Sequence, residues 1–176
     1  MLRLTLLALA GLLGPAAVRP DSQASETELK AAWIYNFAQH VEWPAAAFKD
    51  DKAPLVIGVL GTAAIEEPLG RAVRGKQAQG RTVEIRRAAQ PADLKGAHII
   101  FVPDAEKDRL DQVLSAVHGT AVLVVGESDG LSRRGAAFNF YSDDARVRFE
   151  ANVDTATRAG LAVGSKLLKF ARLVKD

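Results

Sequence analysis

Two runs of apolar residues without a polar interruption constrain the fold of this chain more than any other feature. Residues 55–60 read Leu-Val-Ile-Gly-Val-Leu, and residues 121–125 read Ala-Val-Leu-Val-Val. A strand that is apolar at every position is buried on both faces, as in a parallel sheet covered by helices. Amphipathic segments lie between the apolar runs, so the sequence predicts a mixed, mainly parallel sheet with helices on both faces.

Four further strands complete a predicted sheet of about six strands in one α/β domain, residues 25–176. They are expected at residues 82–86, 98–102, 137–141 and 146–151, and the last two form an antiparallel hairpin around Ser142, Asp143 and Asp144. Helices are expected to begin near residues 25, 62 and 104, with Thr62 and Asp104 as caps.

The first of these helices has the clearest signals. Ser25 and Glu28 have the spacing of a capping box, in which each side chain accepts from the other residue's backbone. A stripe at i+4 spacing follows, which predicts that Leu29, Trp33, Phe37 and Val41 face the core. Ile34 and Ala38 widen this stripe. Pro44 then ends the helix.

Residues 1–24 have the pattern of a secretory signal peptide. Arg3 supplies the positive start, residues 4–13 form a short apolar core, and Ser22-Gln23-Ala24 is a small-x-small cleavage site. Cleavage near Ala16 or Ala17 is the alternative. The apolar run is too short to span a bilayer as a helix. We therefore expect export to the periplasm without membrane insertion.

The C-terminal segment, residues 146–174, is predicted as a strand followed by two short helices. Asp154 can cap the first helix and Ser165 the second. The expected apolar stripe of the second helix consists of Leu167, Leu168, Phe170, Ala171 and Val174. Gly160 to Lys166 is similar to a phosphate-binding loop, but that motif requires lysine before the hydroxyl residue, and here Ser165 precedes Lys166.

This C-terminal segment resembles the closing signature of the YfiR-like family of periplasmic proteins. The matching residues are Phe149, Asn152, Arg158, Ala159, Gly160, Leu161, Ser165, Lys166, Leu167, Leu168 and Ala171. Residues 29–44, with Trp43 and Pro44 at their end, are similar to the opening helix of the family. The middle strands and the glycine-rich turn also match, so the resemblance covers almost the whole mature chain.

The resemblance implies a non-enzymatic regulator. YfiR-like proteins hold an inner-membrane diguanylate cyclase inactive by binding its periplasmic sensing region, and an outer-membrane lipoprotein often sequesters them. It also implies a homodimer. Related domains occur beside different sensors, so a histidine kinase or an outer-membrane receptor is an alternative partner. Relatives carry disulfides, whereas this chain has no cysteine and depends on burial alone.

Charge and composition exclude several other classes. The whole chain has a formal net charge of +2, and loss of the leader with Arg3, Arg19 and Asp21 lowers it by one. A nucleic-acid binder usually has a strongly basic face, so we expect no nucleic-acid partner. The absence of cysteine excludes thiol catalysis and cysteine-ligated metals.

The sequence Gly-Glu-Ser-Asp-Gly at residues 126–130 is the strongest enzyme candidate, because it follows a buried strand as a nucleophile elbow does. In α/β-hydrolases the histidine follows the serine, yet all three histidines precede Ser128. Residues 131–135 are also too polar and too short for the required helix. We therefore expect a turn here and no catalytic residue.

Metal and cofactor sites are not expected. His40, His98 and His118 are far apart in sequence and lack the paired spacing of zinc ligands. Gly58 and Gly61 follow the first strand, but the third glycine of a dinucleotide fingerprint is missing.

Five residues are the candidates for partner or ligand binding: Trp43, Asn139, Asn152, Arg158 and Lys166. Trp43 would suit a protein interface if it is exposed, because tryptophan is enriched at interfaces. The two asparagines and Arg158 would instead line a small-ligand site if the chain is a periplasmic binding module. The crevice beyond the carboxyl ends of the strands is the favoured place for such a ligand.

Overall fold

The computed structural model describes residues 25–61 and 64–175. The predicted leader, residues 1–24, lies outside the described residues, so its role as a signal peptide stays a prediction. The predicted cap Thr62 also lies outside them, and the helix of that region, α2, is described over Glu66–Val73.

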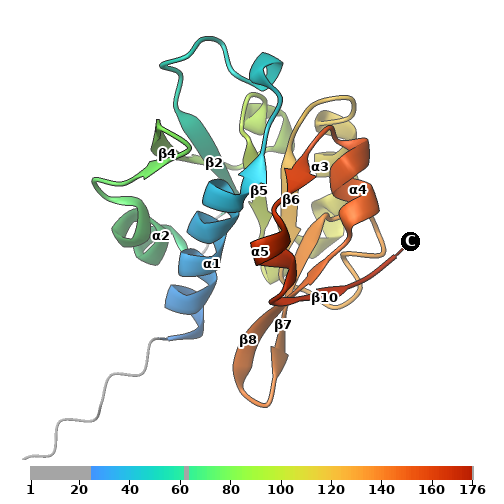
Figure 1. The fold of residues 1–176 in the computed structure, drawn as a ribbon. Coiled ribbons are helices and arrows are strands. Elements are labelled where there is room, and N and C mark those ends of the chain that lie inside the picture. The colour runs from blue at the N-terminus through green and yellow to red at the C-terminus, as the bar shows by residue number, and fades with distance from the viewer. Residues whose placement is uncertain (1–24, 62–63, 176) are drawn as a thin grey trace, which may run out of the picture.

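One mixed sheet of eight strands forms the centre of the molecule (Figure 1). In spatial order the strands are β10 (Ala171–Leu173), β8 (Arg146–Ala151), β7 (Phe138–Asp143), β6 (Leu123–Gly126), β5 (Ile99–Val102), β2 (Leu55–Leu60), β4 (Arg81–Ala88) and β3 (Gln77–Ala78). All neighbouring pairs are parallel except β7–β8 and β3–β4. The predicted mainly parallel sheet and its C-terminal hairpin are confirmed, and two short edge strands extend it.

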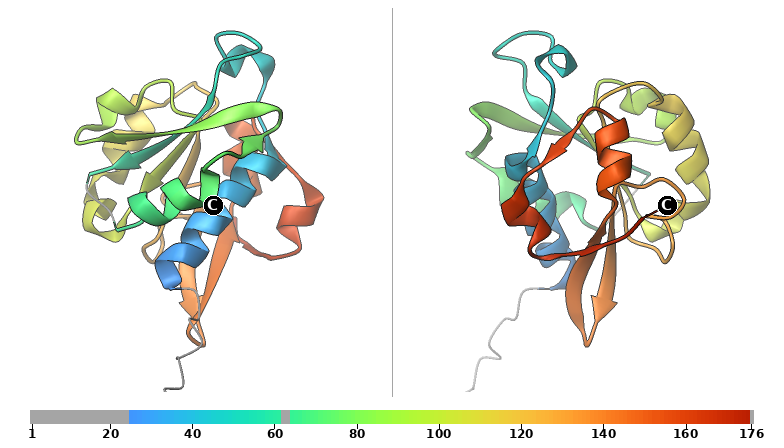
Figure 2. Two further views of the ribbon diagram at one scale, coloured as in Figure 1. Left: turned by 90° about the vertical axis from the view of Figure 1, so that its left-hand side faces the viewer. Right: turned by 45° about the vertical axis from the view of Figure 1, so that its right-hand side comes forward.

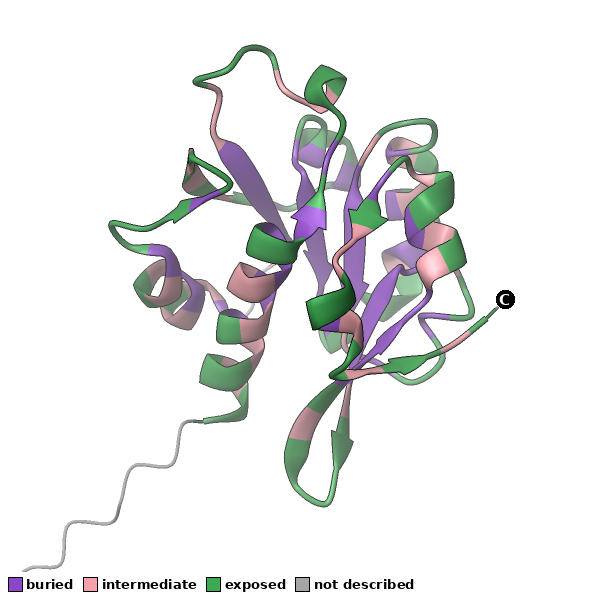
Figure 3. Ribbon diagram, viewed as in Figure 1, coloured by how far each residue is buried: buried purple, intermediate pink, exposed green. Residues whose placement is uncertain are grey.

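Helices cover both faces of the sheet (Figures 1 and 2). The helices α1 (Glu26–His40) and α2 lie on one face, and the 3-10 turn η2 (Pro91–Leu94) and helix α3 (Leu110–Ala116) lie on the other. Consecutive strand residues point to opposite faces. Accordingly, Ile99 belongs to the core under α1 and its neighbour Ile100 to the core under α3. The central strands are buried throughout (Figure 3), as their uninterrupted apolar runs predict.

Helix α1 begins with the predicted capping box, since Ser25 Oγ accepts from Glu28 N and the Glu28 carboxylate accepts from Ser25 N. The predicted inward stripe is wrong at its first position: Leu29 is 39% exposed. The fully buried helix residues are Ala31, Ile34, Phe37 and Ala38. The buried face of α1 therefore begins after Leu29, at Ala31.

The chain leaves α1 through a two-residue strand, β1 (Val41–Glu42), which pairs antiparallel with β9 (Ala162–Val163). A short 3-10 turn, η1 (Ala45–Ala47), then leads toward β2. This small ribbon connects the end of the first helix to the C-terminal region, so the two segments of the family signature are adjacent in space.

The prediction for the last thirty residues is partly wrong. Helix α4 (Val153–Arg158) is capped by Asn152, which accepts from Thr155 N, and not by Asp154. Helix α5 (Ser165–Leu168) has Gly164 at its cap position and is only four residues long. The chain then becomes strand β10 instead of continuing as a helix, because β8 has an open edge whose backbone groups need partners.

The segment after β5 also differs from the expectation. It starts as a 3-10 turn, η3 (Asp104–Arg109), with Pro103 at the cap position, and becomes α-helical only in α3. Asp104 does not cap this helix. Its carboxylate instead accepts a hydrogen bond from Ser128, which lies in the turn after β6.

Candidate functional site

The five predicted site residues do not form one site. Trp43 and Lys166 line one hollow, Arg158 lines another, and Asn139 and Asn152 belong to a buried polar cluster. Each location has a different consequence for function.

Trp43 is a core residue and not an exposed interface aromatic. Its side chain is only 8% exposed, and Nε1 donates to the backbone oxygen of His98 at 3.2 Å. The condition for an interface role, an exposed Trp43 side chain, is therefore not met, since the indole packs in the core beside His98.

Asn139 and Asn152 lie in a buried polar cluster under the C-terminal strand. Asn139 faces Glu150 across the β7–β8 pair, and Asn139 Oδ1 has no hydrogen-bond partner among the described residues. Asn152 Nδ2 donates to the Ser132 carbonyl at 3.2 Å, and the Ser132 hydroxyl donates to the Glu150 carboxylate. These side chains join β7, the end of β8 and the turn that contains Ser132.

Glu150 connects that cluster to β10 through an ion pair with Arg172, with 2.5 Å between Arg172 Nη2 and Glu150 Oε1. Burial by itself raises the pKa of Glu150, but the hydrogen bonds from Ser132 and Arg172 outweigh it and hold the pKa below its usual value. The Arg172 guanidinium also lies over the Tyr141 ring at 3.9 Å. Ion pair and ring contact together fix β10 against the hairpin.

The Gly-Glu-Ser-Asp-Gly turn is an anchor for α1. Glu127 accepts from Lys30 Nζ at 2.8 Å and from Asp104 N at 2.9 Å, while Ser128 Oγ donates to Asp104 Oδ1 at 2.5 Å. The hydrogen bond from Ser128 is the main reason that the pKa of Asp104 is lowered. A carboxylate whose pKa is lowered is a weak general base, so this hydrogen bond does little to activate Ser128 as a nucleophile.

His98 and His118 also lie at the wrong ends of the strands to form a triad with Ser128. Ser128 follows the carboxyl end of β6. His98 and His118 precede β5 and β6, and therefore lie at the opposite ends of these two parallel strands. A catalytic base must reach its nucleophile within hydrogen-bond distance.

His98 is held by packing and by two backbone contacts. Nδ1 accepts from Val56 N at 3.0 Å, so Nε2 carries the proton and donates to the Ala47 oxygen at 3.1 Å. The ring stacks on Phe48 with 4.3 Å between centroids. Burial lowers the pKa of His98, the hydrogen bond to Ala47 opposes this, and Arg81 adds to the lowering. Within residues 25–61 and 64–175, no group of three possible ligands could hold a metal ion.

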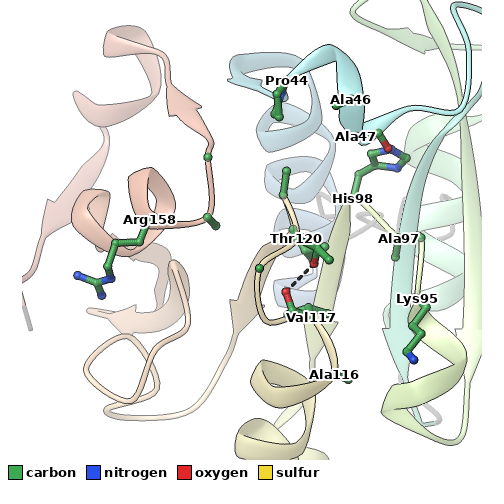
Figure 4. A pocket seen from close by; sticks show the side chains of 16 residues that line it. Pro44, Ala46, Ala47, Lys95, Ala97, His98, Ala116, Val117, Thr120 and Arg158 are labelled. Carbon is green, nitrogen blue, oxygen red and sulfur yellow. Dashed lines mark hydrogen bonds between the residues drawn. The ribbon is translucent and has the colours of Figure 1, made fainter.

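A hollow of about 830 Å³ lies at the amino ends of β5 and β6 (Figure 4). This hollow lies at the opposite ends of the strands from the carboxyl-end crevice that the sequence favoured. Arg158 and Lys95 stand on opposite sides of the hollow, and small residues such as Ala46, Ala97 and Gly160 line most of it. The hollow is large enough for a small ligand, and the cationic side chains of Arg158 and Lys95 lie at its rim.

Two smaller hollows lie between α1 and the C-terminal segment. One, of about 330 Å³, is lined by Trp33, Asn36, His40, Lys166, Leu167 and Phe170. The other, of about 530 Å³, is lined by Gln39, His40, Glu42, Trp43, Gln79, Gly164, Ser165 and Lys166. His40 and Lys166 belong to both, so the two hollows adjoin; we call them together the α1–α5 groove.

Apolar side chains are exposed where the α1–α5 groove meets β10. Phe170 is 62% exposed and Leu173 is 61% exposed. Trp33 connects this surface to the core, since its ring centroid lies 5.8 Å from that of Phe170 and 5.0 Å from that of Phe149. We call Trp33, Phe170 and Leu173 the C-terminal apolar surface. The sequence placed Phe170 on a buried helical stripe and therefore missed this surface.

Comparison with known proteins identifies the chain at the level of family. Residues 27–172 match the YfiR/HmsC-like family over most of the chain. The chain belongs to the YfiR/HmsC-like family. The matched range includes nearly all of α1 and of the segment from β8 to β10, the two segments that carry the sequence resemblance.

A solved structure has the same fold as this YfiR/HmsC-like chain. It is the crystal structure of a conserved domain protein from Vibrio cholerae O1 biovar eltor, with a TM-score of 0.58 and 14% sequence identity. The similarity covers 86% of this chain and 60% of the other chain. At this identity the similarity shows the fold alone, and the present chain spans 60% of the length of the other chain.

Proposed function

We propose that this protein is a non-enzymatic periplasmic regulator that binds the periplasmic sensing region of an inner-membrane diguanylate cyclase and represses it. Membership of the YfiR/HmsC-like family carries the proposal. The C-terminal apolar surface supports it, because exposed aromatic and aliphatic side chains together favour a protein partner. Ser128 and the histidines lack the arrangement that a hydrolase needs.

Repression follows from differential binding. A regulator that binds the inactive form of the cyclase more tightly than the active form shifts the population toward the inactive form. A hundredfold difference in affinity corresponds to about 2.7 kcal/mol, which is within the usual range of allosteric coupling. Sequestration by an outer-membrane lipoprotein would lower the free regulator concentration and restore activity. We further propose that the regulator acts as a homodimer.

The proposed location is the periplasm, with residues 1–24 as a cleaved signal peptide. In the described part of the chain, no helix combines the length and the apolar character that a membrane span requires. The cyclase in the inner membrane would present its sensing region to the regulator in the same compartment.

Deletion of the gene tests the proposal directly. Cellular cyclic di-GMP should rise in the deletion strain, and a plasmid copy of the full chain should restore the original level. The matched control is the same copy without residues 2–24, which should remain in the cytoplasm and fail to restore it. An unchanged cyclic di-GMP level after deletion would contradict the cyclase-repressor function.

A second candidate function is a small-ligand binding module, and the hollow beside Arg158 favours it. Native mass spectrometry of protein purified gently from the periplasm would detect a retained small molecule. Arg158→Ala should then abolish retention while the unfolding midpoint changes little. Protein that carries no added mass would argue against this function and leave the regulator as the better proposal.

A further inference from the structure

Strand β10 is an open edge of the central sheet. It pairs with β8 on one side, and no strand lies beyond it among the described residues. Val174 N donates to the Ala151 oxygen, so the backbone groups of Val174 face β8. Because backbone groups alternate along a strand, those of Ala171 and Leu173 point outward. Each offers an N–H and a C=O to an added strand.

The side chains around this edge are apolar and basic. Phe170 and Leu173 are the two most exposed large apolar residues among the described residues. The chain from residue 159 to residue 175 contains no acidic residue, and its cations are Lys166, Lys169, Arg172 and Lys175. An extended segment beside β10 would therefore meet apolar contacts flanked by positive charge.

The edge is held in place before any partner arrives. Arg172 pairs with Glu150 on β8 and lies over Tyr141 on β7, on the side of β10 that faces the hairpin. Trp33 supports Phe170 from α1. A preformed strand lowers the conformational entropy lost on binding, which favours addition of a further strand.

The opposite edge of the sheet is built differently. There β3 covers the start of β4, and the uncovered part of β4 carries Glu84, Arg86 and Arg87 on a strand of mixed charge. Short covering strands and charged side chains are the usual means of blocking edge pairing. The two edges of the sheet are therefore not equivalent, and β10 is the better receptor.

We propose that an extended segment of the partner protein, in which apolar residues alternate with acidic ones, adds to β10 as a further strand. Its backbone pairs with Ala171 and Leu173, its apolar side chains pack on the C-terminal apolar surface, and its carboxylates face the lysines. A second copy of this chain is a poorer occupant, because two basic edges would repel each other. The identity of the partner as a cyclase rests on the function proposed above.

A peptide probe tests the inference on the purified mature protein. The probe is a fluorescent peptide of about six residues, a typical strand length, with alternating glutamate and valine. We expect saturable binding by fluorescence anisotropy that weakens as salt is added. A matched peptide with lysine in place of glutamate should bind at least roughly tenfold more weakly, a difference of about 1.4 kcal/mol.

Two substitutions at one position separate backbone pairing from side-chain packing. Leu173→Pro removes an outward N–H that β8 does not use, so the fold should be retained, while peptide affinity falls by roughly tenfold or more. Leu173→Ala keeps the N–H and should lose less affinity. Unfolding midpoints of both variants check that the sheet is intact.

Three outcomes would overturn the inference. They are no binding of the acidic peptide up to about 1 mM, affinity that Leu173→Pro leaves unchanged, and a wild-type dimer in sedimentation that Leu173→Pro dissociates. The last outcome would assign the edge to a second copy. These results are independent of the deletion experiment, so an unchanged cyclic di-GMP level would remove the proposed cyclase partner without deciding the edge.

Discussion

At the residue scale, the fully buried side chain of Asn152 both accepts and donates a hydrogen bond. Its Oδ1 accepts from Thr155 N at 3.0 Å, and its Nδ2 donates to the Ser132 oxygen at 3.2 Å. We expect Asn152→Ala to lower the free energy of unfolding by about 2 to 4 kcal/mol, because it removes a helix cap and leaves a buried carbonyl without its donor. Urea denaturation followed by circular dichroism measures the loss.

Asp154→Ala is the matched control in the same helix turn. Asp154 is exposed and does not cap α4. Its replacement should change the unfolding free energy by no more than about 0.5 kcal/mol. Equal losses in the two variants would contradict the assignment of the cap to Asn152.

Glu150 makes the stability of the C-terminal region depend on pH. Because its folded-state pKa lies below the unfolded value of 4.5, the carboxylate stabilises the fold above the unfolded pKa. That contribution is lost as the pH falls through the folded pKa. Glu150→Gln should cost about 1 to 3 kcal/mol at neutral pH, since charge-assisted bonds to Ser132 and Arg172 are weakened.

The measurement is a series of urea unfolding curves for wild type and Glu150→Gln at decreasing pH. The difference between the two proteins should shrink once the pH passes below 4.5. A difference that stays constant over that range would show that ionisation of Glu150 does not contribute.

At the element scale, the β7–β8 hairpin turns through two residues that both have positive φ. These are Asp144 at 46° and Ala145 at 59°. A left-handed conformation costs alanine about 1 to 2 kcal/mol, whereas glycine adopts it freely. Glycine also loses more conformational entropy on folding, which offsets part of this gain. Ala145→Gly should therefore raise the unfolding free energy by about 0.5 to 1 kcal/mol.

Thermal unfolding of Ala145→Gly beside Ala162→Gly checks this prediction. Ala162 lies in the extended strand β9, so glycine there should lower stability by about 0.5 to 1 kcal/mol. If Ala145→Gly lowers stability as well, the turn gains nothing from glycine and the strain argument fails.

The elements that the sequence predicted well are those that a local sequence pattern specifies. The apolar run of β2 and the capping box of α1 are local patterns, and both form where expected. Strand β10 has no such pattern, and the apolar residues of the segment 167–174, which contains it, fit a helical stripe equally well. It becomes a strand because β8, some twenty residues earlier, offers an unpaired edge.

The candidate site shows the same limit. Trp43 and Phe170 are both aromatic residues next to family signature positions, but the structure buries the first and exposes the second. Trp43 is buried where it meets His98, a residue far along the chain, and the ring that Phe170 contacts belongs to Trp33 at the other end of the chain. The lysine-rich end of the chain was the one available signal for the C-terminal surface.

At the scale of the whole molecule, two cores on opposite faces share one sheet. Ile57, Ile99 and Leu123 belong to one core, while Val56, Ile100 and Val124 belong to the other. Because neighbouring residues of the same strands serve both cores, we expect neither face to unfold without the other. The chain should show a single cooperative transition.

The two tryptophans allow this to be measured. Trp33 lies in the aromatic cluster beside β8, and Trp43 lies beside the start of β5. In Trp33→Phe and in Trp43→Phe the remaining tryptophan reports its own region. Its fluorescence midpoint should coincide with the circular dichroism midpoint of the same variant. A separation of the two midpoints in either variant would indicate independent regions.

The sequence by itself determined the layers of this protein. Uninterrupted apolar strands and amphipathic helices specify what must be buried, because the periodicity of apolar residues follows the geometry of each element. Only the tertiary structure decided the character of the C-terminus, where pairing with β8 makes a strand of residues 171–173 and leaves Phe170 and Leu173 at the surface. Backbone hydrogen bonds between strands join residues that are distant in sequence, so no local pattern contains them.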